Sequence, residues 1–485
     1  MLSQTNSQVR ASPRGDYLFV AVCVLAYAAA VLIVPPYTPL IEPDSSDYIQ
    51  FTPVRTALYP AFLAICRALG LGPVEITWVQ LAIFCAALAY LLTTLLRAAF
   101  PRWLLVIFVA MLAGNVLFSS FHRSILTESL YFSLSAVIAG LWINYFKSAH
   151  LNYLLAIGLV LGVMIGVRPA GLGILPMLLF TVWLKRPKNM STWMLVVALV
   201  LPVSVGIGAE RLIYKAAHGG VRNSTAQNLA MGLSAMLIKP NMTFSGPHAA
   251  ELNALGAQLY KKYQPVHRFL EAAPSLPVRT QLSAAYEIEG QFFAFGSEIE
   301  DAARRTGMSA AELEIELGKQ IVYQNLRGYL VLTMVNQLGQ WSVAAKNFPP
   351  TARLLAAYAD ANPAISFNGN ISYAYLHPPP TLVGLIVYPA FLIAGAATLV
   401  LTVVFLVFLW RPRLMESPEG FYLGIAAFFG AMCQGYTLFI SLINEWTPRF
   451  LMAVIPQLEI VAMCLVLIIL HRCEILTLRR PGAAG

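Results

Sequence analysis

The feature that most constrains this chain is a series of apolar runs, most of them about twenty residues long. A helix of that length crosses a hydrocarbon core about 30 Å thick. Only 11% of the 485 residues are charged and 58% are hydrophobic, whereas a soluble domain carries roughly 25% charged residues. The sequence therefore predicts an all-α polytopic membrane protein with about ten transmembrane helices. The expected spans are residues 17–34, 75–97, 103–121, 124–146, 151–167, 169–184, 192–214, 381–410, 421–442 and 450–471.

Basic residues gather in short connections between these runs and at the two ends of the chain. The formal net charge is +9 at pH 7, and this distribution is the bias that marks cytoplasmic loops of membrane proteins. The charge therefore reflects topology, and nucleic acid is not expected as a partner. Arg10 and Arg14 precede the first run as in a signal peptide, but the run is long and Pro35-Pro36 replaces a small-residue cleavage site. A retained first span is predicted, with both termini cytoplasmic.

Three segments follow from this topology. Residues 1–214 form an N-terminal transmembrane module whose first external loop is 36–75, and residues 381–485 form a C-terminal transmembrane module. Residues 215–380 form one large, mainly helical external domain. Ser309-Ala-Ala-Glu312 has the pattern of a capping box before an apolar-periodic run, and 326–345 is expected to be an interfacial helix or an extra partial span. Small residues four apart from Gly158 to Gly166 predict close helix packing.

The cysteines and histidines do not indicate a metal site or a disulfide framework. The six cysteines include no C-x-x-C pair, and the seven histidines show no His-x-x-x-His spacing. Asp44 and Asp47 could share a divalent ion, but ordinary carboxylate pairing accounts for them equally well. No metal and no cofactor is therefore predicted.

Polar side chains that could carry chemistry fall on the predicted external side. An arginine fork donates two hydrogen bonds to a phosphate at once, and an ionised carboxylate beside it can accept a proton from a hydroxyl. Acids and arginines that converge at one membrane face therefore predict a site for an anionic lipid head group. The candidates are Asp44, Asp47, Tyr48, Arg55, Tyr59, Glu128, Arg168, Glu445 and Arg449.

Five short motifs in this order resemble the GT-C glycosyltransferases that use polyprenyl-phosphate sugars. Protein O-mannosyltransferases and the lipid A aminoarabinose transferase belong to this group. The resemblance covers most of the membrane part, and the external domain contributes nothing to it. The motifs are Pro43-Asp44-Ser-Ser-Asp47-Tyr48, Arg55-Thr-Ala-Leu-Tyr59-Pro60, Thr127-Glu128-Ser-Leu, Arg168-Pro169 and Glu445-Trp-Thr-Pro-Arg449-Phe450.

The resemblance implies inverting transfer of a sugar from a polyprenyl-phosphate donor to an acceptor hydroxyl on the external face. It implies that the first acid of the first external loop, Asp44, is the catalytic base, with Asp47 or Glu128 orienting acceptor or sugar. Many members have Asp-Glu where this chain has Asp44-Ser45, so either Asp44 or Asp47 fits the role. The donor phosphate would meet arginines. Candidates for that contact are Arg55, Arg168 and Arg449, with Tyr48, Tyr59 and Glu445 as further substrate-binding residues.

The expected partners are membrane lipid, the lipid-linked sugar donor and a glycan, lipid or protein acceptor, in the inner (plasma) membrane. Structural roles compete with these functions: Asp44, Ser45 or Ser46 could cap a short interfacial helix, and Asp47 could be a structural or head-group residue. Glu128 could be a charge at a helix N-terminus, and Arg168 could be a snorkelling residue. Glu445 and Arg449 could form a solvated ion pair. A polysaccharide ligase or polymerase with a lipid-diphosphate donor is an alternative function, and a lipid or solute transporter is another.

Overall fold

The computed structural model is built from helices, and it describes residues 13–33, 39–42, 44–187, 190–220, 236–290, 296–362, 373–444 and 446–478. Within these ranges the β-structure is one isolated bridge between Leu40 and Ser124. The chain divides into two compact units. Unit 1 contains residues 1–219, 401–430 and 452–485, and unit 2 contains residues 220–400 and 431–451. This division does not test the predicted membrane boundaries at 214/215 and 380/381, which stay predictions.

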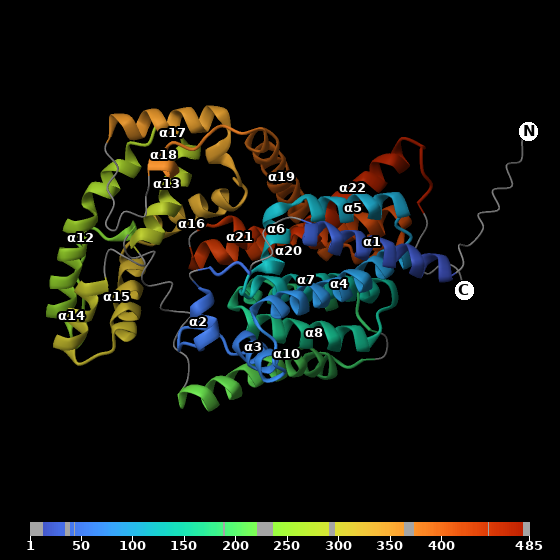
Figure 1. Cartoon of the computed structure of the whole chain (residues 1–485), viewed down its shortest axis with the longest axis horizontal. Coiled ribbons are helices and arrows are strands. Elements are labelled where there is room, and N and C mark those ends of the chain that lie inside the picture. Colours follow the sequence, from blue (N-terminus) through green and yellow to red (C-terminus); the bar gives the residue numbers. More distant parts are fainter. Residues whose placement is uncertain are drawn as a thin grey trace, which may run out of the picture. The chain divides into compact units, whose positions relative to one another are not determined.

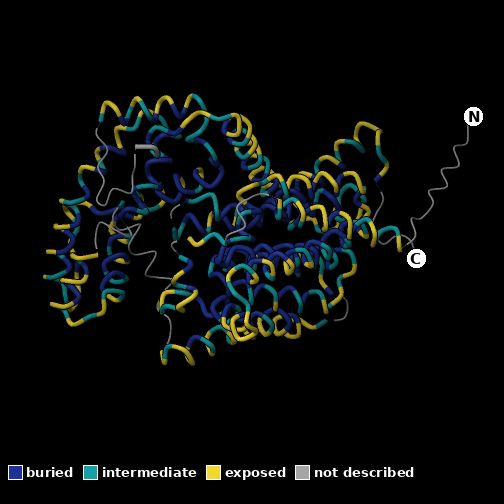
Figure 2. Tube along the Cα trace, viewed as in Figure 1, coloured by how far each residue is buried: buried dark blue, intermediate teal, exposed yellow. Residues whose placement is uncertain are grey.

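Unit 1 is a bundle of apolar helices (Figure 1). Four of them pack in sequence, each against the next: α4 (Pro73–Arg97), α7 (Glu128–Ser148), α8 (Leu151–Val167) and α10 (Thr192–His218). Among the candidate spans of the described residues, α7 is the most buried, with 78% of its apolar stretch inside the protein, whereas only 22% of that of α1 is buried (Figure 2). Its helices are α1 (Pro13–Ile33), α2 (Ser45–Gln50), α3 (Leu58–Ala68), α4 (Pro73–Arg97), α5 (Arg102–Gly114), α6 (Val116–Ser120), η1 (Phe121–Arg123), α7 (Glu128–Ser148), α8 (Leu151–Val167), η2 (Pro169–Ile174), α9 (Leu175–Leu184), α10 (Thr192–His218), η5 (Pro412–Glu416) and α22 (Ile455–Arg472).

The predicted close packing at the small-residue stripe of α8 is confirmed. A Cβ atom added to Gly162 would lie 2.5 Å from the backbone oxygen of Val203, and one added to Gly206 would lie 2.5 Å from the Gly162 carbonyl carbon. Glycine at both positions therefore lets the backbones of α8 and α10 touch, which no larger residue permits. This contact fixes the end of α8, where Arg168 lies, against α10.

Among the described residues, seven helices are long and apolar enough to cross a membrane, or eight if a bent pair counts as one span. The chain is thus a multi-pass helical membrane protein, and the count of about ten stays a prediction. The predicted span 103–121 is bent by 67° between α5 and α6, because Asn115 Oδ1 accepts the Phe118 N–H at 3.1 Å and starts a new helix. Helix α8 has 17 residues, and the segment after it begins with the 3-10 turn η2 at Pro169.

Unit 2 has its own core, in which Leu255, Tyr263, Leu282, Leu317 and Leu355 are all buried. The capping box at the start of α15 is confirmed, since Ser309 Oγ accepts the Glu312 N–H and Glu312 Oε2 accepts the Ser309 N–H. Its helices are α12 (Ala249–Glu271), α13 (Leu276–Glu289), α14 (Gly296–Thr306), α15 (Ala310–Gln324), α16 (Leu326–Gln340), η4 (Ala345–Asn347), α17 (Pro349–Ala361), α18 (Tyr373–Leu376), α21 (Pro448–Met452) and parts of α19 (Leu382–Trp410) and α20 (Pro418–Ile443).

Candidate functional site

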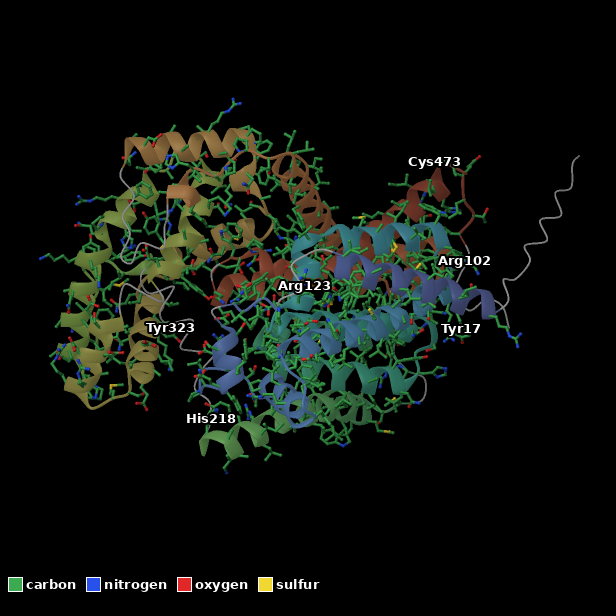
Figure 3. The ribbon with its side chains drawn as sticks, viewed as in Figure 1. Tyr17, Arg102, Arg123, His218, Tyr323 and Cys473 are labelled. Atoms are coloured by element: carbon green, nitrogen blue, oxygen red, sulfur yellow. The ribbon has the colours of Figure 1, made fainter. Side chains whose placement is uncertain are left out.

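The connections predicted to be cytoplasmic gather at one end of unit 1. Asp16 Oδ1 accepts a hydrogen bond of 2.6 Å from Arg102, and Lys147 donates to the Arg97 backbone oxygen at 2.6 Å. Figure 3 shows Tyr17 and Arg102 toward this end of the unit and Arg123 and His218 toward the other. The predicted site residues of unit 1 lie at the Arg123 and His218 end, so the bundle separates its basic connections from its candidate site.

Arg55 is the centre of the first external loop. Its Nη2 atom lies 2.7 Å from Asp44 Oδ1 and 2.7 Å from Asp47 Oδ2, and its Nε atom donates to Asp47 Oδ2 at 3.1 Å. The three side chains are 22–34% exposed, so they reach solvent from a partly covered position. Asp44 precedes α2 but makes no side-chain capping hydrogen bond. The alternative role of Asp44 as a helix cap is therefore wrong, because its carboxylate turns to Arg55.

Two tyrosines connect this cluster to the bundle. The Arg55 guanidinium lies 4.8 Å from the centre of the Tyr48 ring, and the rings of Tyr48 and Tyr59 meet edge to face at 5.2 Å. The Tyr59 hydroxyl donates to Gln80 Oε1 at 2.8 Å, and Gln80 Nε2 donates to the Ser124 backbone oxygen at 2.9 Å. The loop acids are thus held by a continuous set of contacts that reaches α4 and the segment before α7.

A second ion pair lies at the same end of unit 1. Arg168 Nη1 lies 2.8 Å from Glu128 Oε1, and the two side chains are only 11% and 2% exposed. Glu128 is the first residue of α7, where the helix dipole favours a negative charge. Arg168 follows α8 in an extended conformation and precedes Pro169. The alternative role of Arg168 as a snorkelling residue is wrong, because its guanidinium turns inward to a buried carboxylate.

Anchoring contacts hold the loop on α8 and α10. Thr56 Oγ1 donates to the Val167 backbone oxygen at 2.8 Å, and Glu210 Oε1 accepts the Ala57 N–H at 3.2 Å. The Tyr214 hydroxyl donates to the Pro53 backbone oxygen at 2.8 Å. These bonds satisfy polar groups that would be costly if buried alone, and they fix Arg55 relative to Arg168.

Charges from both ion pairs act on the Tyr48 phenol. Burial raises the pKa of the Tyr48 phenol, Glu128 adds to the rise, and Arg55 and Arg168 oppose it. Burial lowers the pKa of the Arg55 guanidinium, but the opposing effects of Tyr48, Asp44 and Asp47 are together larger. The pKa of Arg55 therefore lies above its usual value. At neutral pH the site therefore holds a neutral phenol beside a permanent cation.

The last motif of the sequence does not belong to unit 1. Glu445 lies outside the described residues, and Arg449 belongs to unit 2, in α21, where its guanidinium lies 5.5 Å from the Phe450 ring centre. Their predicted roles in substrate binding stay predictions. Among the described residues, no group of three or more His, Cys, Asp or Glu side chains could hold a metal ion.

Sequence reasoning missed two residues of the site. Gln80 joins Tyr59 to the segment before α7, and Glu210 holds the backbone at Ala57. Both are polar residues within otherwise apolar predicted spans, 75–97 and 192–214. A polar side chain within a membrane span costs free energy unless it faces a partner. The presence of Gln80 and Glu210 in apolar spans could therefore have predicted that each contacts a polar group.

Comparison with protein-family models, with curated proteins and with solved structures finds no match for this chain.

Proposed function

We propose that the protein is a membrane glycosyltransferase of the GT-C kind. It transfers a sugar from a polyprenyl-phosphate donor to an acceptor hydroxyl with inversion. The observation that carries the proposal is Arg55 bound to two carboxylates in the loop after the first span. A phosphate-binding fork and two proton acceptors then lie within hydrogen-bond distance of each other, which is what this transfer needs.

The reaction begins with an exchange of partners at Arg55. A donor phosphate carries negative charge and accepts two hydrogen bonds from a guanidinium, as a carboxylate does. When the donor binds, its phosphate takes over Arg55 hydrogen bonds from Asp44 or Asp47. The released carboxylate then turns to the acceptor hydroxyl. Donor binding and activation of the base are in this way coupled through one cation.

The chemical step forms one bond and breaks one. The acceptor oxygen attacks the anomeric carbon from the side opposite the phosphate, and its proton passes to the carboxylate of Asp44 or Asp47. The bond between the anomeric carbon and the phosphate oxygen breaks, and the electron pair leaves with the polyprenyl phosphate. Arg55 stabilises the charge that develops on that phosphate. Tyr48 and Tyr59 are buried next to the cluster, where the Tyr48 ring supports the Arg55 guanidinium.

The buried pair of Glu128 and Arg168 supports this site by holding the start of α7 against the end of α8. Arg168 also adds positive potential at the phosphate. The protein lies in the inner (plasma) membrane with both termini cytoplasmic, so the transfer takes place on the external face. The donor chain lies among the spans, and the acceptor is a glycan, lipid or protein hydroxyl.

The test compares turnover of purified full-length protein and its Asp44→Asn and Asp47→Asn variants. The probes are polyprenyl-phosphate hexoses and pentoses and the matching polyprenyl diphosphates, with release of the polyprenyl phosphate followed by mass spectrometry. A general base contributes about 10²–10⁴-fold, so the variant that lacks it should lose at least about 100-fold in turnover. Asp16→Asn is the matched control, because Asp16 pairs with Arg102 at the other end of unit 1.

Parental turnover in both Asp44→Asn and Asp47→Asn would overturn the proposal. Turnover of the diphosphate donors alone would replace it with the ligase or polymerase function. Passage of a lipid or solute across a liposome membrane without donor turnover would replace it with a transporter.

A further inference from the structure

Unit 2 contains a cavity of about 690 Å³. It is walled by α12, α13, α16 and the segment 236–240, and every residue that lines it belongs to unit 2. A drug-sized or lipid-sized head group fits within such a volume, because ligand pockets are typically about 300–1,000 Å³. The proposed transferase reaction does not use this cavity.

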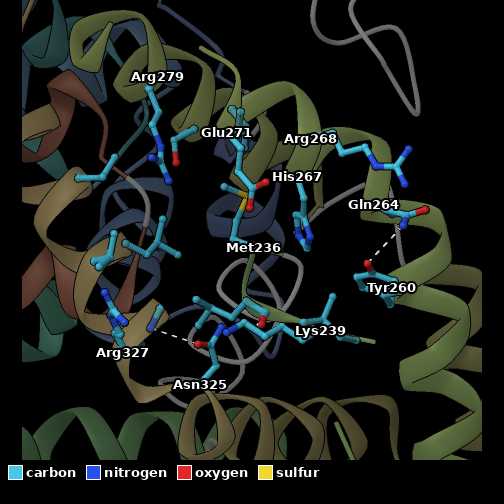
Figure 4. A pocket seen from close by; sticks show the side chains of 18 of the residues that line it. Met236, Lys239, Tyr260, Gln264, His267, Arg268, Glu271, Arg279, Asn325 and Arg327 are labelled. Atoms are coloured by element: carbon cyan, nitrogen blue, oxygen red, sulfur yellow. Dashed lines mark hydrogen bonds between the residues drawn. The ribbon is translucent and has the colours of Figure 1, made fainter. Parts of the chain in front are cut away.

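The lining of the cavity is strongly cationic. Four positive charges come from Lys239, Arg268, Arg279 and Arg327, and Glu271 is the one carboxylate among the described lining residues. Figure 4 shows Arg279 and Arg327 reaching toward the cavity from opposite walls, α13 and α16, while Arg268 points away at the rim. Among the described residues, the side chains of these four cations form no hydrogen bond or ion pair. An excess of positive charge around one cavity creates a positive potential that concentrates anions.

The rest of the lining is apolar. Leu237, Ile238, Leu270, Leu332 and Val335 are buried around the cavity. Asn325 closes one side through Nδ2, which donates to the Leu237 backbone oxygen at 2.9 Å. Cations at the mouth and buried aliphatic side chains behind them suit a ligand with a charged end and an apolar body.

Helix α16 continues this apolar lining onto the protein surface. Val331 lines the cavity and is 48% exposed. Four more large apolar side chains of α16 are exposed at helical spacing: Leu326, Leu330, Met334 and Leu338. Such a stripe on a helix that also carries a cation is typical of a segment in contact with lipid.

We propose that the cavity binds a phosphate-bearing amphiphile. Its phosphate lies between Arg279 and Arg327, and its hydrocarbon chain leaves past Val331 along the apolar stripe of α16. A phosphate monoester carries about −1.5 to −2 charges near neutral pH, which compensates the excess of cations in the lining. Two arginines on opposite walls can each donate to a different pair of oxygens of one tetrahedral group.

The experiment measures binding by isothermal titration calorimetry to the full-length protein in a neutral detergent. The probes are dihexanoyl phosphatidic acid, inorganic phosphate and dihexanoyl phosphatidylcholine, and no sugar transfer is involved. We expect phosphatidic acid to bind at least about tenfold more tightly than either of the other two. The double variant Arg279→Gln with Arg327→Gln should lose at least about tenfold in affinity, because charge-assisted hydrogen bonds are the strong ones.

Three further variants separate the contributions. Arg304→Gln is the matched control, since Arg304 is exposed on α14 and pairs with Asp301 away from the cavity; its affinity should equal that of the parent. The double variant Arg279→Lys with Arg327→Lys keeps the charge and loses the fork, so its affinity should lie between the two. Val331→Asn should weaken binding of phosphatidic acid and leave inorganic phosphate unchanged. Thermal unfolding checks that each variant is folded.

Parental affinity in the folded Arg279→Gln, Arg327→Gln protein would overturn the site. Equal affinity for phosphatidic acid and phosphatidylcholine would overturn the role of the phosphate, and equal affinity for inorganic phosphate would overturn the amphiphile. Because binding is measured without a donor sugar, these outcomes do not depend on the turnover of the Asp44→Asn variant.

Discussion

The Arg55 cluster of unit 1 and the cavity of unit 2 differ in whether their arginines are ion-paired. Arg55 is held by Asp44 and Asp47 at hydrogen-bond distance, and the nearby Arg168 is held by buried Glu128. Arg279 and Arg327 face the cavity with no ion-pair partner among the described residues. An ion-paired arginine stabilises the fold, and an anionic ligand competes with its carboxylates. An uncompensated one weakens the fold slightly and attracts an anion directly.

The largest expected difference between the two regions is the effect of removing a charge partner on stability. Glu128→Gln leaves the Arg168 guanidinium buried without its carboxylate. Loss of one partner of a buried ion pair costs about 3–5 kcal/mol, so the free energy of unfolding should fall by that amount. Denaturant unfolding in detergent, followed by tryptophan fluorescence, measures it.

The double variant Glu128→Gln with Arg168→Gln provides the control for this prediction. Removal of both charges leaves no buried ion unpaired, so its loss of stability should be smaller than that of Glu128→Gln alone. If Glu128→Gln unfolds with the parental free energy, the pair does not hold α7 against α8. The claim that ion-paired arginines stabilise unit 1 would then be wrong.

The smallest expected change in the free energy of unfolding comes from removing an arginine in unit 2, and its sign is opposite to that of Glu128→Gln. Arg279→Gln removes one of several like charges around the cavity, so in the absence of ligand its free energy of unfolding should be unchanged or higher, by up to about 0.5 kcal/mol. The same unfolding measurement at low ionic strength checks it. A loss of more than about 1 kcal/mol would mean that Arg279 makes a stabilising contact within the protein, and the cavity would no longer contrast with the Arg55 cluster.

Much of the fold could be predicted from hydropathy alone, because long apolar runs have few other uses than membrane helices. The predicted span 75–97 lies within α4, and 192–214 lies within α10. One break within a predicted span was missed, at Asn115, which caps a new helix by a side-chain bond to the Phe118 backbone. The break at Arg168-Pro169 was expected between spans 151–167 and 169–184, and a 3-10 turn begins there. Hydropathy averages over a window and does not register a single capping residue.

The candidate site was predicted in part. Asp44, Asp47 and Arg55 are close in sequence and come together as expected. Arg168 was predicted to meet the donor phosphate, which stays a prediction; the structure pairs its guanidinium with buried Glu128. That pairing depends on how α7 and α8 pack, which is a long-range property that residue type and spacing do not determine.

The exchange of partners at Arg55 is the central claim, and donor binding tests it most directly. The measurement is the dissociation constant of a polyprenyl-phosphate sugar for the parent and for Asp44→Asn, by calorimetry in the same detergent. A neutral amide competes less well than a carboxylate for Arg55, so the variant should bind the donor more tightly, by about tenfold, while its turnover falls. Weaker or unchanged donor binding in folded Asp44→Asn would contradict the exchange and leave the Arg55 cluster a structural element of the loop.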